Sequence, residues 1–213
     1  MKRRPDRLGP KSAGAICPAS VAFRGGKPLR YEAVLKTDQQ VIDSERFALR
    51  PPQPSDVGLL EHYTSDKRVA EETRSIPHPL APGVAEAFVR RAMDADRIED
   101  VWIMDGAGHG EDLRGHEVLG VISLTRMDRK QSQLGYWVAP PFWNTGLASE
   151  AVQALIAANP LGDDTFFAEV FQDNPNSARV LTNAGFEYVG DAEAFSVARG
   201  TTVPTWTYVR KMG

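Results

Sequence analysis

The chain has 213 residues and an apolar content of 42%, which suits one domain with a packed core, alone or with an extension. Its single cysteine, Cys17, excludes an intrachain disulfide framework and a cysteine-rich zinc site. The four histidines show no HExxH or paired ligand spacing, and no apolar run approaches the ~20 residues of a membrane span, so we expect neither a metal site nor a membrane helix.

The net charge of −3 conceals an asymmetry along the chain. Residues 1–40 hold nine Lys/Arg against three acids, for +6, whereas the rest holds 16 bases against 25 acids, for −9. An acidic body argues against general nucleic-acid binding and is compatible with a cationic substrate. The basic segment is interpreted as a disordered tail, with a contact to nucleic acid or the ribosome as the alternative. Its interrupted apolar stretch is a poor signal peptide, so we expect a cytoplasmic protein.

The pattern divides the chain into an extension, 1–43, and a domain, 44–213. The extension is rich in Pro, Gly and Arg, lacks periodicity, and contains one candidate strand, RYEAVL at 30–35. The domain begins with a strand at 46–51, RFALRP, which alternates and stops at a double proline, as a first or edge strand does.

Two helices and a proline loop come next. Pro54 and Asp56 suit a helix start, and Leu59, Leu60 and Tyr63 give that helix one apolar face. The prolines of IPHPL predict an extended loop. Pro82 then opens a second helix, with its apolar positions at helical spacing on Val84, Ala87, Phe88 and Ala92.

Three strands follow, at 100–105, 117–127 and 133–138. Between the first two lies GAGHG at 106–110, which resembles a phosphate loop but precedes no helix, so a hairpin connection is the favoured interpretation. The second half predicts helix 146–158, strand 165–171, helix 176–184, strand 186–191 and strand 205–211. Helices alternating with strands after an antiparallel start indicate an α/β (α+β) fold, with a mixed sheet flanked by helices.

The stretch GYWVAPPFWNTGLASEAVQAL carries the first candidate site. A strand ends at a double proline, and a helix with its buried stripe on Leu147, Ala151 and Leu155 starts near Gly146. The first N–H groups of such a helix lack internal partners and carry the positive end of its dipole. The turn is therefore able to hold a phosphate, although many strand–Gly–helix turns bind nothing. No P-loop or dinucleotide fingerprint is present.

The second stretch, DNPNSARVLTNAGF, joins a strand to a short helix that ends at Gly185, a C′ glycine. Taken alone, Asn174 and Ser177 suit turn and helix-cap chemistry. The two stretches together, with SERFALRPPQPSD and RSIPHPLAPGVAEAFV, resemble the GNAT acetyltransferase superfamily and its RimJ/RimL-type branch of ribosomal-protein N-terminal acetyltransferases. The resemblance covers residues 44–212.

The resemblance implies an acetyl-CoA site between splayed central strands, and no metal. The family's pyrophosphate loop falls on residues 143–148, where Trp143 departs from the family's Arg/Gln and Thr145 stands where Lys or Arg is common. Val138 and Ala139 would bond the pantetheine arm through backbone N–H groups, and Asn174 matches the asparagine that contacts the arm. The implied cofactor-binding residues are Trp137, Val138, Ala139, Trp143, Asn144, Thr145, Gly146, Leu147, Ala148, Asn174 and Arg179.

Acetyl transfer needs a neutral amine, a polarised carbonyl and a proton for the leaving thiolate. Many family members supply that proton from a tyrosine at the position of Leu181. Ser177 stands where this branch has a serine, so we expect it, with Asn174, at the reacting sulfur; a structural cap is the alternative. Gln133 replaces a carboxylate common in relatives. The general base stays open between a water relay and four side chains: His78, His116, Glu117 and Asp128.

We therefore expect an acetyl-CoA-dependent N-acetyltransferase, acting by direct transfer on a protein N-terminus or a small, cationic amine. The alternative is a non-catalytic acyl-CoA-binding or regulatory module, which the absence of Tyr at 181 and of Glu at 133 favours. Whether the chain forms a homodimer is left open.

Overall fold

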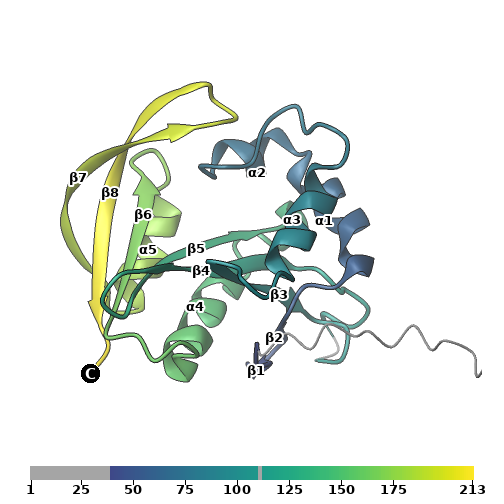
Figure 1. The fold of residues 1–213 in the computed structure, drawn as a ribbon, viewed down its shortest axis with the longest axis horizontal. Helices are drawn as coiled ribbons and strands as arrows, with labels where there is room; N and C mark the ends of the chain where they lie inside the picture. The colour runs from purple at the N-terminus through teal and green to yellow at the C-terminus, as the bar shows by residue number, and fades with distance from the viewer. Residues whose placement is uncertain (1–38, 110–111) are drawn as a thin grey trace, which may run out of the picture. The chain divides into compact units, whose positions relative to one another are not determined.

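In the part of the chain that the structure describes, residues 39–109 and 112–213, eight strands form one sheet in the order β1-β2-β3-β4-β5-β6-β8-β7 (Figure 1). This computed structural model pairs every neighbouring strand antiparallel except β5 with β6, which are parallel. The mixed, mainly antiparallel sheet expected from the sequence is confirmed. The strands are β1 (Ile42–Asp43), β2 (Ala48–Arg50), β3 (Glu99–Asp105), β4 (Gly120–Met127), β5 (Gln131–Val138), β6 (Thr165–Phe171), β7 (Glu187–Ser196) and β8 (Thr201–Lys211).

Helices cover both faces of the sheet because its central strands alternate their apolar side chains between two cores. Trp102 and Met104 of β3 face a core completed by α4 and α5, whereas Val101 and Ile103 face a core completed by α1 and α3. Figure 1 shows α1 and α3 on one side of β3–β5 and α4 on the other. The helices are η1 (Pro54–Asp56), α1 (Val57–Thr64), α2 (Lys67–Glu71), α3 (Val84–Ala92), η2 (Pro140–Phe142), α4 (Leu147–Ala158) and α5 (Pro175–Asn183).

A gap opens between β5 and β6. Their pairing covers only Gln131–Leu134 against Thr165–Ala168. β5 nevertheless continues to Val138 along β4, and β6 continues to Phe171 along β8. Each strand is held by its outer neighbour while its inner edge is left without a strand partner. The splayed strands expected from the family resemblance are therefore present, and they create exposed backbone in the middle of the sheet rather than at its rim.

The β7–β8 hairpin is longer than the expected strands, 186–191 and 205–211. The two strands pair along their whole length, from Glu187 opposite Val209 to Ser196 opposite Thr201. The segment GDAEA within β7 has weak strand propensity on its own, so pairing with β8 has overridden the local preference. The extra length carries the hairpin tip back toward α2, as Figure 1 shows.

Two helical predictions need correction. α2 was not anticipated, because five residues are too few to show a helical period; Asp66 caps it by accepting the Arg68 N–H at 2.9 Å. α3 begins at Val84 rather than Pro82, because Gly83 at φ +82° forms the N-cap. Its most buried side chains are Ala85, Val89 and Ala92; of the predicted apolar positions, Ala92 is buried and Phe88 packs against the same core.

Other predictions have mixed outcomes. β3 and β4 are antiparallel neighbours, which confirms that the segment with GAGHG connects a hairpin. The candidate strand at 30–35, Cys17 and residues 1–38 of the extension lie outside the described residues, whereas the last two residues of the predicted extension form β1. No helix among residues 39–109 and 112–213 is both long enough and apolar enough to cross a bilayer. The cytoplasmic location and the domain boundary at residue 44 stay predictions.

A buried ion-pair network fixes the entry to α1. Arg50 of β2 donates two hydrogen bonds to Asp56, at 2.8 and 2.9 Å, and a third to Asp105 of β3. Asp56 also accepts the Gln53 N–H at 2.7 Å, and its side chain is only 1% exposed. Burial alone would lower the pKa of Arg50, but its bonds to Asp56 and Asp105 raise it above the ordinary value. The guanidinium therefore stays charged and ties three segments together.

We predict that Asp56→Ala lowers the free energy of unfolding by about 3 kcal/mol, because it leaves a mostly buried guanidinium incompletely paired. Urea unfolding measures the change. Lys67→Ala is the control, since it removes an exposed pair with Glu71 at 3.5 Å and should cost less than about 0.5 kcal/mol. Equal, small losses in both variants would contradict a structural role for the network.

Candidate active site

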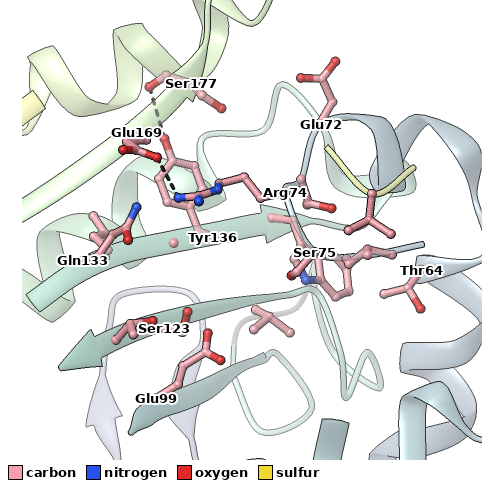
Figure 2. A pocket seen from close by; sticks show the side chains of 18 of the residues that line it. Thr64, Glu72, Arg74, Ser75, Glu99, Ser123, Gln133, Tyr136, Glu169 and Ser177 are labelled. Atoms are coloured by element: carbon pink, nitrogen blue, oxygen red, sulfur yellow. Dashed lines mark hydrogen bonds and ion pairs between the residues drawn. The ribbon is translucent and has the colours of Figure 1, made fainter. Parts of the chain in front are cut away.

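Two cavities meet at the gap between β5 and β6. The α4 cavity, about 790 Å³, is lined by α2, the end of β5, the loop before α4 and the start of α5. The α3 cavity, about 580 Å³, is lined by α1, α3, the loop at 72–80 and strands β3–β6 (Figure 2). The cavities adjoin one another, and five residues line both: Glu72, Tyr136, Trp137, Asn174 and Ser177.

The start of α4 forms one end of the α4 cavity. Gly146 is the N-cap residue at φ +84°, a backbone conformation that side chains other than glycine rarely adopt. The first helical bond runs from the Glu150 N–H to the Gly146 carbonyl, so the N–H groups of residues 147–149 precede the helix ladder. Gly146, Leu147, Ala148 and Ser149 all line the cavity. Free amides and the positive end of the helix dipole therefore face a space that suits an anion.

Two arginines distant in sequence lie beside this loop. Arg46 donates to the Thr145 carbonyl at 3.0 Å, but its guanidinium is paired with Glu150 at 2.6 Å. Arg68 of α2 lines the α4 cavity, with its guanidinium 5.2 Å from the centre of the Trp143 ring. The Arg68 guanidinium is itself paired with Asp66 at 2.7 Å, so both arginines beside the loop already have a carboxylate partner.

The end of β5 presents backbone to the gap. The Ala139 N–H already donates to the Leu119 carbonyl at 2.8 Å, and Ala139 is fully buried outside both linings. Because amide directions alternate along an antiparallel strand, the N–H groups of Tyr136 and Val138 point away from β4 and toward the gap. Of the two amides expected to face a ligand, Val138 has the suitable geometry and Ala139 is engaged elsewhere.

The start of α5 forms the opposite wall. Asn174 caps the helix, its Oδ1 accepting the Ser177 N–H at 3.0 Å, and its side-chain amide lies within hydrogen-bonding reach of the Glu72 carboxylate. Ser177 lines both cavities, and its Oγ makes no hydrogen bond within the described residues. Leu181 is fully buried at the wall of the α3 cavity, whereas Arg179 is exposed and lines neither cavity.

Tyr136 links the two walls. Its hydroxyl donates to the Ser177 carbonyl at 3.1 Å, as Figure 2 shows. Burial raises the pKa of the phenol well above its ordinary value, and the bond to Ser177 opposes this only in part. Tyr136 therefore stays neutral at physiological pH and acts as a fixed hydrogen-bond donor at the meeting point of the cavities.

Charged side chains are concentrated in the α3 cavity. Its lining includes three acids, Glu72, Glu99 and Glu169, and two arginines, Arg74 and Arg91. Arg74 reaches across to Glu169 at 2.7 Å in front of β5 (Figure 2). None of the four base candidates named from the sequence lines either cavity: His78, His116, Glu117 and Asp128. Glu72 was not among the residues predicted from the sequence, because it follows the short helix α2, which was not predicted, and it belongs to no recognisable motif.

The tip of the β7–β8 hairpin closes one side of both cavities. Arg199 donates to the Glu71 carbonyl at 2.8 Å, pairs with Asp173 at 2.5 Å and lies 4.8 Å from the centre of the Phe171 ring. The Val197 N–H donates to the Arg74 carbonyl at 3.0 Å. These bonds join the hairpin to α2, to the loop that follows it and to the turn before α5. The meeting point of the cavities is thereby enclosed by segments from three parts of the chain.

The sequence matches a known family and two curated proteins. A family model described as an acetyltransferase (GNAT) domain matches residues 46–187. The uncharacterized N-acetyltransferase YoaA of Bacillus subtilis is 30% identical over 96 residues, which span 43% of this chain but only 54% of YoaA. The uncharacterized N-acetyltransferase p20 of Bacillus licheniformis is 23% identical over 79% of this chain and 94% of its own length.

Solved structures share the fold. RimL, a ribosomal L7/L12 alpha-N-protein acetyltransferase in complex with coenzyme A, matches with a TM-score of 0.69 at 19% identity, over 81% of this chain and 98% of its own. Spermidine N-acetyltransferase from Vibrio cholerae, in complex with CoA and spermine, matches with a TM-score of 0.64 at 13% identity, over 78% of this chain and 96% of its own.

Proposed function

The chain belongs to the GNAT acetyltransferase family, and we propose that it transfers the acetyl group of acetyl-CoA directly to a primary amine within a ternary complex. The observation that carries this proposal is the meeting of two cavities at the β5–β6 gap. The α4 cavity contains a helix start that suits an anion, and the α3 cavity has an acidic lining. The same five residues line both cavities. Direct transfer requires such a shared point, because donor and acceptor must be held together in reacting geometry.

The α4 cavity is the proposed acetyl-CoA site. Its pyrophosphate would accept hydrogen bonds from the N–H groups at the start of α4, over the proposed loop from Trp143 to Ala148. Arg68, stacked over Trp143, would add the positive charge that the loop itself lacks. The pantetheine arm would run along β5 to the gap, where Val138 N–H and the Asn174 amide are suited to bond it. Trp137 would border the arm at the point where the cavities join.

The shared residues are suited to the chemistry of acyl transfer. The β5 amides that face the gap can hydrogen-bond the thioester carbonyl as it gains negative charge. The Ser177 hydroxyl, without a partner in the described residues, can hydrogen-bond the leaving thiolate. Because Asn174 already caps α5, that hydroxyl is not required for the helix start. Ser177 and Asn174 are therefore proposed as the residues at the sulfur.

The α3 cavity is the proposed acceptor site, and a cationic amine is the favoured acceptor. Three carboxylates against two guanidinium groups line it, and one of those guanidinium groups is already paired with Glu169. Acceptors of this kind include a protein N-terminus, as the RimJ/RimL branch would use, and small polyamines. The fold match to RimL, with the proline loop at the cavity mouth, supports assignment to that branch.

We predict that the purified protein releases CoA from acetyl-CoA when a primary amine is supplied. A thiol-detection assay over N-terminal peptides, polyamines and aminoglycosides measures this, with matched N-acetylated amines as controls. Tight acetyl-CoA binding without CoA release for any amine would contradict the proposal and favour a non-catalytic acyl-CoA-binding module.

Gly146→Glu is predicted to weaken acetyl-CoA binding by at least about tenfold, because it brings a side chain and a negative charge to the phosphate cradle. Calorimetric titration measures the affinity. Gly83→Glu is the matched control: Gly83 has φ +82° against +84° for Gly146, it also begins a helix, and open space surrounds it. Both variants should lose about 1 kcal/mol of stability from left-handed strain. Unchanged affinity in Gly146→Glu would overturn the phosphate assignment.

Ser177→Ala is predicted to lower turnover by about tenfold with little change in acetyl-CoA affinity, because only the hydrogen bond to the departing thiolate is removed. Single-turnover kinetics and calorimetry separate the two effects. Because the cap is made by Asn174, the melting temperature should hardly change. Wild-type turnover in this variant would leave Ser177 without a catalytic role.

A further inference from the structure

Glu72 differs from the other acids of the α3 cavity in its position. Glu99 and Glu169 line the α3 cavity only, whereas Glu72 lines both cavities. It is the C-cap residue of α2, at the start of the loop that borders the cavity, and Figure 2 shows it apart from the Arg74–Glu169 pair. Of the three acidic residues, Glu72 alone lines both the cavity proposed for acetyl-CoA and the cavity proposed for the acceptor.

The Glu72 carboxylate lies within hydrogen-bonding reach of the Asn174 side-chain amide but is not held by a cation in the described residues. Within residues 39–109 and 112–213 it forms no ion pair, whereas Glu169 is held by Arg74 at 2.7 Å. Arg199, the nearest cation on the hairpin tip, is already paired with Asp173 at 2.5 Å. Glu72 is exposed as a residue, and partial burial of its carboxylate is the main influence that raises its pKa; Asp173 and Glu71 add to the rise, while Arg199 and the Asn174 amide oppose it.

Resting on the proposed acetyl transfer, we propose that Glu72 binds the acceptor amine at the junction and takes its proton as the new bond forms. The nitrogen becomes acidic as its lone pair attacks the thioester carbon, so a carboxylate beside it can accept the proton. The N–C bond forms and the C–S bond breaks, and the thiolate leaves with the electron pair. The thiolate takes a proton from solvent while Ser177 hydrogen-bonds it, and Glu72 returns its own proton to solvent.

Other side chains at the junction are unsuited to this role. Tyr136 is held neutral by burial and already donates to the Ser177 carbonyl. Trp137, Asn174 and Ser177 have no basic group near neutral pH. Gln133, which lines the α3 cavity, is an amide and cannot take up a proton. The carboxylate that relatives carry at that position on β5 is thus replaced here by one from the end of α2.

The pH dependence follows from the direction of the pKa shift. Only the carboxylate form of Glu72 is active, so the rate falls as pH drops through a pKa raised above the ordinary glutamate value. A peptide α-amine deprotonates near pH 8 and adds a second limb at higher pH. The logarithm of kcat/KM should therefore rise with a slope of about two at low pH and about one at intermediate pH.

Glu72→Gln tests this with peptide acceptors. We expect kcat to fall about 100-fold with acetyl-CoA affinity unchanged, and the limb at low pH to disappear so that the slope is about one throughout. Glu99→Gln is the matched control, because it removes the same charge from the same cavity at a position away from the junction. It should keep the low-pH limb, whatever its effect on KM for the acceptor.

Chemical rescue separates a proton acceptor from a merely structural residue. Glu72→Ala should regain part of its turnover when formate or acetate is added, because a small carboxylate can occupy the vacated space. Wild-type protein and Glu99→Ala should show no such gain. If wild-type protein turns over but Glu72→Gln keeps its rate and its low-pH limb, the role of Glu72 is overturned while the acetyl transfer stands. A wild-type protein that releases no CoA with any amine overturns both.

Discussion

The short parallel pairing of β5 with β6 is the constraint on which the rest of the site depends. Four residues of each strand pair, and beyond Leu134 and Ala168 the strands separate while their outer neighbours continue to hold them. Backbone groups in the middle of a sheet are costly to leave without partners. The gap therefore provides a binding site whose hydrogen-bonding groups are positioned by rigid strands rather than by a mobile loop.

Segments that are distant in sequence converge on this gap. The starts of α4 and α5 follow closely after the two splayed strands, so chain connectivity places the first N–H groups of α4 and the Asn174 cap of α5 beside the gap. α2 and the β7–β8 hairpin are held beside the gap by tertiary contacts. Arg199 at the hairpin tip donates to the Glu71 carbonyl of α2 and pairs with Asp173 in the turn before α5. The hairpin tip and the end of α2 thereby border both cavities close to the point where donor and acceptor would meet.

The proposed catalytic arrangement distributes its roles over three elements. Ser177 and Asn174 lie on α5, the amides facing the gap lie on β5, and Glu72 lies at the end of α2. The two side chains that relatives often use, a tyrosine on α5 and a carboxylate on β5, are here Leu181 and Gln133. In the proposed mechanism, Ser177 of α5 and Glu72 at the end of α2 take over these two functions.

The sequence by itself determined the features that depend on residues close along the chain. Gly146 before the stripe of α4, the Asn174 cap and the Gly185 stop of α5 are local, since each concerns backbone bonds within about one helical turn. Only the tertiary structure decided that Arg68 lies over Trp143, that Ala139 is engaged with Leu119, and that Glu72 stands at the junction of two cavities. These three arrangements depend on packing between segments that are far apart in the chain. The helix α2, which carries Arg68 and leads into Glu72, is too short to show a helical period in the sequence.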